Sequence, residues 1–596
     1  MKFTSRIIYV LAFIIFVASC RKSNNNSGNN FSANEIPSRG DWVVQHETAD
    51  PECLNPSISS DATSSEMFNY LYQRLTVADP NSLIRKPQIS ENVPVDSGDH
   101  LQYDFNLNKK AVFSDGKPIT AADFIFYLKV IKNPLLAEAE PHRGYLTDVF
   151  SAEIIDNDPY KLRFKMIKPN CLAIQSISEE LYAVPKHIWD VNNISDKISW
   201  QMLDKPNLSD TILSNFANLM KDANKNTDPK YIIGSGTYLL SEFKRNERVV
   251  FERNEKFWGG DSAYNFNYPD KIIFRTINDY NAALSSLKGG EIDFMPTMPK
   301  VLYNNVKNSF NSVKVESCEY DFPSYDYVGY NSENPIFKDK NVRKALAYAI
   351  NRDEIISKIY FNMANKVQSP LYYKSKEYNQ NIPLIEYNVE KAKSLLKSSG
   401  WTDSDGDGIL DKEINGKKLK FKFEFILNSD NTTRNQIALV LIDAFRKLGI
   451  EATVTGLEWA TLLKRLKNHE FDATVSGWAT DPFESDLYQL WHSGSAIKGG
   501  SNYVSFKNQD VDDLIIKMRT EFDLNKRKLM NYKLQEIINE EQPINFLVSA
   551  LRTGARSNRF QNVNYFSARP GYNIAAWWIP QNLRKYNSSG KSLPVN

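Results

Sequence analysis

Residues 421–454 read FKFEFILNSDNTTRNQIALVLIDAFRKLGIEATV, and this stretch decides the fold class. Phe421, Phe423 and Phe425 alternate with other residues, which predicts a β-strand with one buried face. Apolar residues then recur at helical spacing until Gly449, a typical residue after the last helical turn. These apolar residues are Ile437, Leu441, Ala444 and Leu448. A second alternating run, 450–454, predicts another strand. The order strand, helix, strand predicts a parallel pair with a right-handed crossover, the repeating unit of α/β folds.

After a short predicted helix, 461–466, the chain enters a further strand that ends at Trp478. The apolar residues that alternate in this strand are Phe471, Ala473 and Val475. Asp481 follows in Gly477-Trp478-Ala479-Thr480-Asp481-Pro482, at the carboxyl end of the strand, where α/β folds bind ligands. A buried carboxylate is costly unless it is paired, so a cation would satisfy it. The alternative interpretation is a turn, because Asp-Pro is a common turn sequence.

Length and composition exclude some classes of protein. The chain has 596 residues, which is more than one hydrophobic core supports, and this length predicts two or three lobes. The formal net charge is only +2, and nothing in the sequence resembles the basic face of a nucleic-acid-binding protein. Aromatic residues make up 12% of the chain, which suits aromatic-lined pockets and ordinary cores equally well.

The first residues have the order of a secretory signal. Two basic residues precede an apolar run at 7–17, which is too short to span a membrane. The sequence Val17-Ala18-Ser19-Cys20 resembles the bacterial lipobox, in which cleavage leaves the cysteine as a lipid-modified first residue. We therefore expect removal of residues 1–19, which leaves a formally neutral chain, and anchoring to a lipid bilayer through acylated Cys20. The alternative is an ordinary signal peptide with an unmodified cysteine.

The polar, asparagine-rich segment that follows, residues 20–40, predicts a flexible tether between the lipid and the globular part. Export makes disulfide bonds possible, but only three cysteines remain after Cys20, so at most one bridge can form. These cysteines are Cys53, Cys171 and Cys318.

Local patterns in the first half predict a series of elements that starts with a strand at 41–44. A helix is predicted from 64 to 75 and a strand from 101 to 107. Thr120 stands three residues before Asp123, the spacing of a capping box at a helix start. The buried stripe of that helix should contain Phe124, Tyr127, Leu128 and Ile131.

Several longer blocks of sequence follow one another in a recognisable order. They are FSDGKPITAAD (113–123), VPKH (184–187), GSGTY (234–238), RNEKFW (253–258), GEID (290–293), NVRKALAYAI (341–350) and the segment from EKA (390–392) to GW (400–401). Together they resemble the extracellular solute-binding proteins of the oligopeptide- and dipeptide-binding class, family 5 of the receptors of bacterial ABC importers. The resemblance covers the chain from about Asp41 to the C-terminus.

This resemblance implies an α/β fold like that of periplasmic binding proteins, with two lobes around a cleft, crossing hinge strands and an inserted third lobe. The implied segments are 41–73, 205–318 and 555–596 for lobe I, 74–204 for the inserted lobe and 319–554 for lobe II. We expect Gly234-Ser235-Gly236 to lie where the chain passes between lobes, because small residues absorb hinge angles.

The function implied by the resemblance is that of a substrate-binding lipoprotein. It would capture peptides in the cleft and deliver them to the permease subunits of an ABC importer, as a monomer that faces the periplasm or the cell exterior. We expect no required cofactor and no catalysis, since the sequence has no His-x-x-x-His pair, no Cys-x-x-Cys pair and no nucleophile elbow. ATP hydrolysis would belong to the partner, because the chain has no Gly-x-x-x-x-Gly-Lys-Ser/Thr loop. The alternatives are a non-peptide solute such as a nickel chelate or a sugar and, from another class, a surface peptidase.

The resemblance also implies ligand-binding residues. In the family, an acid that follows Gly-Trp by three residues pairs with the α-ammonium group of the peptide, which gives this role to Asp481 beside Gly477 and Trp478. A second segment bonds the ligand backbone like an added strand, which suits peptides of any sequence. Its counterparts here are Ser60, Asp61 and Ala62.

Trp459 matches a family tryptophan that lines a side-chain pocket. The sequence departs from the oligopeptide-binding members close to it, because Leu466 and Val475 stand where those members carry arginines. Arg465 is one position away from the first of these. No residue is therefore implied for the ligand carboxylate, and a longer peptide or a ligand without a free carboxylate becomes plausible.

The segment DSDGDGILD at 403–411 matches the first half of an EF-hand loop. Calcium takes six to eight oxygen ligands, and most of them could come from Asp403, Asp405, Asp407, the carbonyl of Ile409 and Asp411. The twelfth position holds Ile414 in place of the bidentate glutamate, with Glu413 one place away. The two hypotheses are a structural calcium site and a solvated acidic turn.

Overall fold

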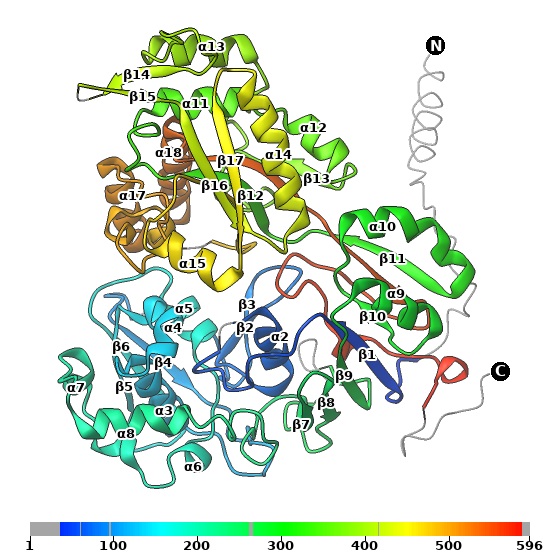
Figure 1. The fold of residues 1–596 in the computed structure, drawn as a ribbon. Coiled ribbons are helices and arrows are strands. Elements are labelled where there is room, and N and C mark those ends of the chain that lie inside the picture. The colour runs from blue at the N-terminus through cyan, green and yellow to red at the C-terminus, as the bar shows by residue number, and fades with distance from the viewer. Residues whose placement is uncertain are drawn as a thin grey trace, which may run out of the picture. The chain divides into compact units, whose positions relative to one another are not determined.

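The computed structural model describes residues 36–59, 61–94, 97–260, 266–414, 416–484 and 486–586. The signal peptide expected at 1–19, the lipidated Cys20 and most of the tether expected at 20–40 lie outside these residues. The described residues from Ser38 to Tyr586 belong to one compact unit (Figure 1). Within the part of the chain that is described, no helix combines the length and the apolar character needed to cross a bilayer.

Lobe I is built on a seven-stranded sheet whose strands come from both ends of the chain. In spatial order they are β11 (Val315–Tyr320), β20 (Arg552–Ser557), β10 (Phe294–Met295), β1 (Trp42–Glu47), β9 (Lys271–Thr276), β8 (Arg248–Arg253) and β7 (Tyr238–Lys244). The predicted first strand is β1, which pairs in parallel with β9 and β10. Its apolar run, Val43 and Val44, is buried because the strand lies in the middle of the sheet. The α-helices of this lobe, among the described residues, are α2 (Ala62–Leu71), α9 (Tyr280–Gly289) and α10 (Lys300–Val306).

Buried ion pairs tie the start of β1 to β10 and to the C-terminal segment. The Arg559 guanidinium pairs with Asp41 and, at 2.8 Å, with Asp293, and all three side chains are at most 5% exposed. Lys585 adds a contact of 2.9 Å to Asp293. Burial alone would raise the pKa of Asp293, but the positive charges of Arg559 and Lys585 outweigh it and lower that pKa.

The inserted lobe contains a three-stranded antiparallel sheet, a short hairpin and several helices. The sheet is formed by β4 (Gln102–Asn106), β6 (Lys161–Met166) and β5 (Val149–Ile154), and the hairpin by β2 (Thr76–Ala78) and β3 (Arg85–Pro87). The helices are α3 (Ala121–Lys132), α4 (Glu140–Arg143), α5 (Ala173–Glu180), α6 (Lys186–Trp189), α7 (Trp200–Asp204) and α8 (Thr211–Met220). The predicted capping box opens α3, where the Thr120 amide donates to Asp123 over 2.9 Å. Phe216 of α8 packs edge-on against Phe126 of α3, so this lobe extends past the boundary expected at residue 204.

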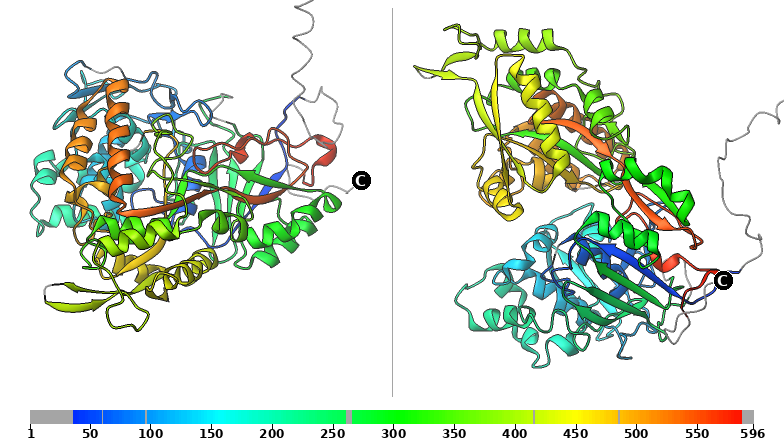
Figure 2. Two further views of the ribbon diagram at one scale, coloured as in Figure 1. Left: turned by 90° about the horizontal axis from the view of Figure 1, so that it is seen from above. Right: turned by 45° about the vertical axis from the view of Figure 1, so that its right-hand side comes forward.

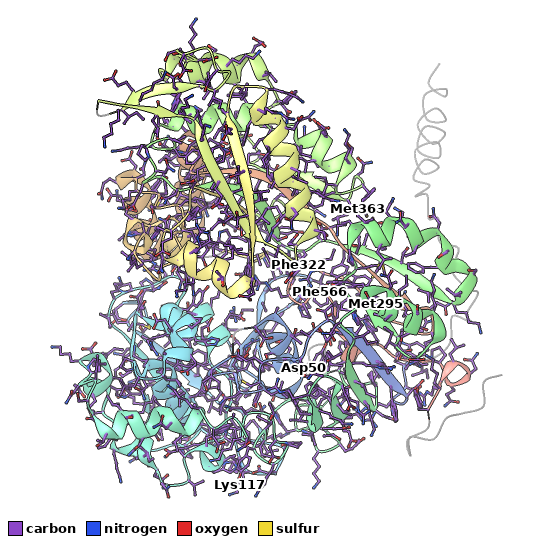
Figure 3. All side chains as sticks on the ribbon, in the orientation of Figure 1. Asp50, Lys117, Met295, Phe322, Met363 and Phe566 are labelled. Carbon is purple, nitrogen blue, oxygen red and sulfur yellow. The ribbon has the colours of Figure 1, made fainter. Side chains whose placement is uncertain are left out.

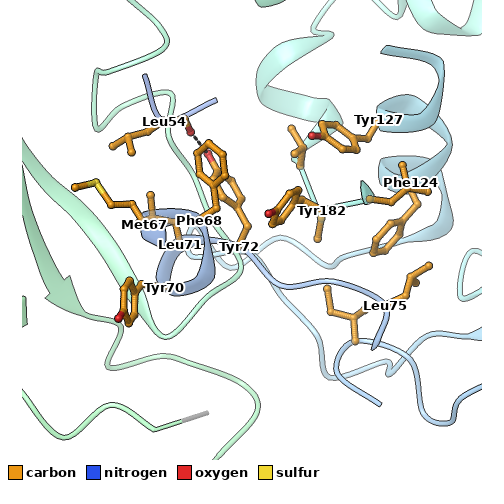
Figure 4. Packing of buried hydrophobic residues seen from close by; sticks show 14 of the residues in the cluster. Leu54, Met67, Phe68, Tyr70, Leu71, Tyr72, Leu75, Phe124, Tyr127 and Tyr182 are labelled. Atoms are coloured by element: carbon orange, nitrogen blue, oxygen red, sulfur yellow. Dashed lines mark hydrogen bonds between the residues drawn. The ribbon is translucent and has the colours of Figure 1, made fainter. Parts of the chain in front are cut away.

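One continuous hydrophobic core joins the inserted lobe to lobe I. Figure 4 shows this packing around α2, where the ring of Phe68 meets the ring of Tyr182 at 5.8 Å. The Tyr72 hydroxyl donates to the Leu54 carbonyl over 3.0 Å and so satisfies its own polar atom inside the core. The helix predicted to reach residue 75 ends at Leu71, because Tyr72 adopts an extended backbone. Leu75 is nevertheless fully buried, which is why its spacing resembled a helical stripe.

Lobe II is built on a six-stranded sheet that contains the predicted β-α-β unit. Its strands, in spatial order, are β13 (Ala364–Lys366), β19 (Ile544–Ala550), β12 (Ser324–Tyr330), β18 (Ala473–Ala479), β16 (Lys422–Asn428) and β17 (Glu451–Leu457). The parallel pairing of β16 with β17 confirms the prediction from 421–454. The helices are α11 (Lys340–Ala349), α12 (Arg352–Lys358), α13 (Val389–Ser398), α14 (Thr432–Arg446), α15 (Trp459–Lys467), α16 (Tyr488–Trp491), α17 (Gln509–Thr520) and α18 (Leu524–Glu541), and a hairpin is formed by β14 (Asp411–Ile414) and β15 (Lys417–Lys420).

Two short segments carry the chain between the two large sheets: 321–323, between β11 and β12, and Leu551, between β19 and β20 (Figure 2). The boundaries expected at 318/319 and 554/555 fall inside β11 and β20. Figure 3 marks Phe322 in the first segment, and the guanidinium carbon of Arg552 lies 3.5 Å from the centre of its ring.

The segment Gly234-Ser235-Gly236 does not lie at these crossings. A Cβ atom on Gly234 would stand 2.0 Å from the Leu71 carbonyl oxygen, and one on Gly236 would stand 2.1 Å from the carbonyl oxygen of Tyr70. The Ser235 hydroxyl accepts a hydrogen bond from the amide of Gln73 over 2.7 Å. The segment lies instead between α8 of the inserted lobe and β7 of lobe I, so it is at a passage between lobes, as expected. Its glycines are required for close packing against the end of α2, and a hinge role stays a prediction.

Candidate functional site

A cavity of about 530 Å³ lies where lobe I, the inserted lobe and lobe II meet. Its lining includes Tyr70 and Tyr572 from lobe I, Glu180 and Tyr182 from the inserted lobe, and Asp481 and Phe483 from lobe II. The volume is in the range of small-molecule sites, and a concave wall that combines aromatic rings with a few charged groups is typical of them.

Asp481 reaches this cavity from the loop that follows β18. Its carboxylate forms no hydrogen bond or ion pair with another described residue. Burial raises the pKa of Asp481, and the nearby carboxylates of Glu179 and Glu180 raise it further, whereas the positive charge of Arg569 acts in the opposite direction. A bound cation would relieve both the desolvation and the repulsion.

The inserted lobe supplies two further acids to the lining, close enough to Asp481 to raise its pKa. Glu179 and Glu180 end α5 and line the cavity. Arg85 bonds Glu179 over 2.8 Å, and His142 Nδ1 lies 2.7 Å from Glu180 Oε2. Both carboxylates therefore have partners within their own lobe, which leaves Asp481 as the acid without one.

Aromatic rings form much of the remaining wall. The rings that line the cavity are Tyr70, Tyr72, Tyr145, Tyr182, Phe266, Phe483, Phe566 and Tyr572. Burial raises the pKa of Tyr145 to about 12, so its hydroxyl stays protonated and able to donate at neutral pH. Flat apolar faces of this kind can contact many kinds of side chain.

Arg569 is the functional candidate that the sequence did not reveal. It lines the cavity from the C-terminal segment, is exposed, and has a loose contact with the Phe322 ring at 5.9 Å. No hydrogen bond or ion pair joins its guanidinium to another described residue. Its neighbourhood in the sequence, with Phe566 and Tyr572, is aromatic, but no spacing connects it to Asp481.

Comparison with known proteins places the chain in a family. The model of the bacterial extracellular solute-binding proteins, family 5 middle, matches residues 85–500. The chain belongs to this family.

Relatives of this family 5 protein match more than nine-tenths of its length. It is 32% identical over 583 residues to the oligopeptide-binding protein AppA of Bacillus subtilis, which covers 96% of this chain and 97% of that protein. The structure of AppA from Bacillus subtilis in complex with a nonapeptide matches with a TM-score of 0.72 at 28% identity, covering 92% of this chain and 100% of that one. NikZ from Campylobacter jejuni in complex with Ni(L-His) also gives a TM-score of 0.72, at 24% identity, with 91% and 100% coverage, and so shares the fold. The expected family and fold class are confirmed.

The predicted neighbours of Asp481 in this family 5 protein lie at the end of β18. Gly477 has no room for a side chain, since a Cβ atom would stand 2.6 Å from Asp326 Oδ1. Trp478 is half-buried and packs against the Tyr503 ring at 5.3 Å. Neither residue lines the cavity around Asp481, and their ligand contacts remain predictions.

The segment predicted to bond the ligand backbone lies at the start of α2. Ser60 lies outside the described residues. Asp61 is the N-cap of α2 and accepts a hydrogen bond from the Ser64 amide over 2.9 Å, while Ala62 is exposed. Asp61 also accepts from the Ser59 hydroxyl over 2.7 Å, so its carboxylate has a structural function.

Trp459 and the residues discussed with it are not part of the cavity lining. Trp459 begins α15 and is 45% exposed. Leu466 and Val475 are buried, and Arg465 donates to the Glu470 carbonyl over 2.9 Å. None of these residues lines the cavity. The described lining contains two arginines, of which Arg74 already bonds Asn69 and the Tyr182 hydroxyl, so the candidate for a ligand carboxylate is Arg569.

The acidic loop of this family 5 protein joins α13 to β14. Oxygens of Asp403, Asp405 and Asp411 lie within 4.8 Å of one another, a spacing that one calcium ion could bridge. Lysines from β15 compete for the same oxygens: Lys418 bonds Asp405 over 2.8 Å, and Lys420 pairs with Asp407. The hydrogen bond from Lys418 lowers the pKa of Asp405 to about 2. Three of the four predicted aspartates thus offer carboxylate oxygens to one ion if the lysines move away, whereas Asp407 is not in this group, and calcium binding stays a prediction.

We expect calcium to raise the melting temperature and EDTA to lower it, without a change in ligand affinity, because the loop is separate from the cavity. Lys418→Met removes a competing charge and should tighten calcium binding, measured by isothermal titration. Equal melting temperatures with calcium and with EDTA would leave the acidic turn as the correct interpretation.

Proposed function

We propose that this chain is the substrate-binding subunit of an ABC importer, which captures peptides in the cavity and delivers them to the membrane permease. The observation that carries this proposal is the unpaired, partly desolvated carboxylate of Asp481 in an aromatic-lined cavity. A peptide ammonium group would satisfy that carboxylate, and Arg569 offers a partner for a ligand carboxylate. The name of AppA and the nonapeptide in its structure support a peptide as the ligand.

The importer partner and the location follow from the same proposal. We infer that Cys20 is acylated, that the chain is exported and anchored to a bacterial membrane, and that residues 20–40 give it reach toward the permease. It acts as a monomer and returns its ligand uncleaved. A ligand that touches more than one lobe favours the closed form, which the permease would recognise.

The direct test is ligand binding by the full chain. We expect native mass spectrometry of protein purified from its own cell to show bound peptide, and short free peptides to raise the melting temperature. A ligand at one hundred times its Kd adds about 2.7 kcal/mol to the stability, which corresponds to a shift on the order of a few degrees. Nickel–histidine is the contrasting ligand. If it raises the melting temperature and no peptide of a varied library does, the hypothesis that the ligand is a peptide is rejected. Cleaved peptide after long incubation would indicate a peptidase.

A further inference from the structure

The inserted lobe touches lobe II directly, along a set of contacts that we call the seam. The Cys171 amide donates to the Arg519 carbonyl over 2.8 Å, and the Cys171 thiol lies 3.3 Å from the carbonyl oxygen of Met518. The rings of His100 and Phe522 stack with centroids 3.4 Å apart. The seam therefore pairs residues 100 and 171 of the inserted lobe with residues 518–522, the end of α17 and the turn that follows it. It is separate from the crossing segments 321–323 and Leu551.

Lobe II connects the seam to Asp481 through one loop. The described residues of this loop are 481–484 and 486–487. Arg519 bonds Asp486 through two nitrogens, with Nε 3.1 Å from Oδ2, and its guanidinium lies 4.4 Å from the centre of the Tyr488 ring. Arg519 thus contacts the inserted lobe with its carbonyl and fixes the Asp481 loop with its side chain.

The inserted lobe has a matching connection. Helix α5 begins two residues after Cys171 and ends at Glu179 and Glu180, which line the same cavity as Asp481. Within α5, the Gln175 amide group donates to the carbonyl of Glu484 over 3.3 Å, so the helix also meets the loop directly. The cavity is therefore connected to the seam on both sides, through α5 in the inserted lobe and through the Asp481 loop and Arg519 in lobe II.

A second ion pair fixes the same loop from inside lobe II. Arg527 bonds Glu484 through two nitrogens, at 2.5 Å and 2.8 Å, and its side chain is 7% exposed. Its guanidinium also donates to the carbonyl of Glu521 over 2.6 Å. Because Arg527 supports the loop without bonding the inserted lobe, loss of the Arg519 side chain should loosen the connection to the seam and leave the loop attached to α18.

We propose that Arg519 is a positioning residue. It couples Asp481, the proposed partner of the ligand ammonium group, to closure of the inserted lobe on lobe II at the seam. This inference rests on the proposed function, since it treats Asp481 as a ligand contact. When a ligand cation orders Asp481, the loop, Arg519 and the amide of Cys171 are ordered with it. Coupling between two sites typically amounts to roughly 5- to 150-fold in affinity, and it acts in both directions.

Cys171 is a built-in reporter of the seam. It is a free, partly buried thiol, and burial raises its pKa to about 11, so it reacts slowly while the seam is closed. Cys53 and Cys318 are free thiols buried in lobe I, and burial also raises their pKa values to about 11. They serve as internal controls, because opening of the seam does not expose them.

The experiment measures maleimide labelling of each thiol in the full chain by peptide-level mass spectrometry. Without any peptide, Arg519→Met should speed labelling of Cys171 by roughly 5-fold or more and leave Cys53 and Cys318 unchanged. Arg446→Met, which removes an exposed pair with Asp443 on α14, is the matched control and should change none of the three rates. An unchanged Cys171 rate in Arg519→Met would overturn the proposal whether or not a peptide is known.

A second arm uses a peptide that the wild type binds. Saturating peptide should slow Cys171 labelling in the wild type, and Arg519→Met should weaken peptide affinity and lose most of that protection. Arg519→Lys, which keeps the charge, should restore part of the peptide affinity and part of the protection of Cys171. Protection of the same size in Arg519→Met, or none in the wild type at saturation, would contradict the coupling. If no peptide binds, that result counts against the proposed function instead. The ligand-free labelling of Cys171 would still test whether the Arg519 side chain holds the seam closed.

Discussion

Asp481→Asn is expected to weaken the binding of peptides with a free amino terminus by roughly 10- to 100-fold, the range that follows from losing a hydrogen-bonded charge pair. The physical reason is that the carboxylate has no partner among the described residues and is partly desolvated, so it contributes most when an ammonium group binds. The same substitution should change the binding of N-acetylated peptides little. Titration calorimetry with matched pairs of free and acetylated peptides measures the difference.

The pH dependence gives a second readout of Asp481. Its pKa is raised, and only the ionised form pairs with an ammonium group, so affinity for free-amine peptides should fall as the pH drops through that raised pKa. The asparagine variant should lose this dependence. Asp513→Asn, an exposed acid on α17, is the control that should behave like the wild type. Equal losses for free and acetylated peptides would make Asp481 a structural residue of the turn.

Arg559→Met is expected to lower the free energy of unfolding by about 3–5 kcal/mol, because it leaves the buried carboxylates of Asp41 and Asp293 without their main counter-charge. Urea unfolding at neutral pH measures the loss. The pKa of Asp293 is lowered in the fold, so its contribution is present above the pKa of the unfolded chain and disappears as the pH falls through the folded value. The gap between wild type and variant should therefore narrow in acid.

The control for this prediction is an exposed pair in the same lobe. Arg248 pairs with Glu242 at 3.0 Å, and both side chains are more than one-third exposed. Arg248→Met should change the stability by less than about 1 kcal/mol, as is usual for surface pairs. If Arg559→Met also lowers the free energy of unfolding by less than about 1 kcal/mol, the buried ion pairs do not hold the starts of β1 and β10 in place.

The sequence predicted correctly those structural elements that depend on residues close together in the chain. The alternation in 421–454 and the capping box at Thr120 depend on residues close in sequence, and both predictions were confirmed. The position of Asp481 after a strand could be predicted for the same reason. The sequence predicted that Gly234-Ser235-Gly236 lies between lobes, but not that its requirement for small residues comes from packing against α2, far away in the sequence.

The rest of the candidate site depends on contacts between distant segments. Arg569 reaches the cavity from the C-terminal segment, and the two further acids of the lining come from the end of α5, so no spacing rule connects any of them with Asp481. For Asp61 the missed contact is a local one. Its carboxylate caps the start of α2, a structural function that the resemblance to the family does not reveal. Both sides of the seam are likewise far apart in sequence.

The strand order of lobe I has a consequence for how the chain is assembled. Strand β20 lies between β11 and β10, and the ring of Trp42 stacks on that of Tyr586 at 4.2 Å. Lobe II is formed by one uninterrupted stretch, from β12 to β19, whereas lobe I needs both ends of the chain. During synthesis, we expect lobe II to mature first and lobe I to stay incomplete until the last residues are released. A nascent chain truncated before residue 552 should therefore contain a folded lobe II and remain protease-sensitive in its first three hundred or so residues, an estimate that follows from domains folding as units.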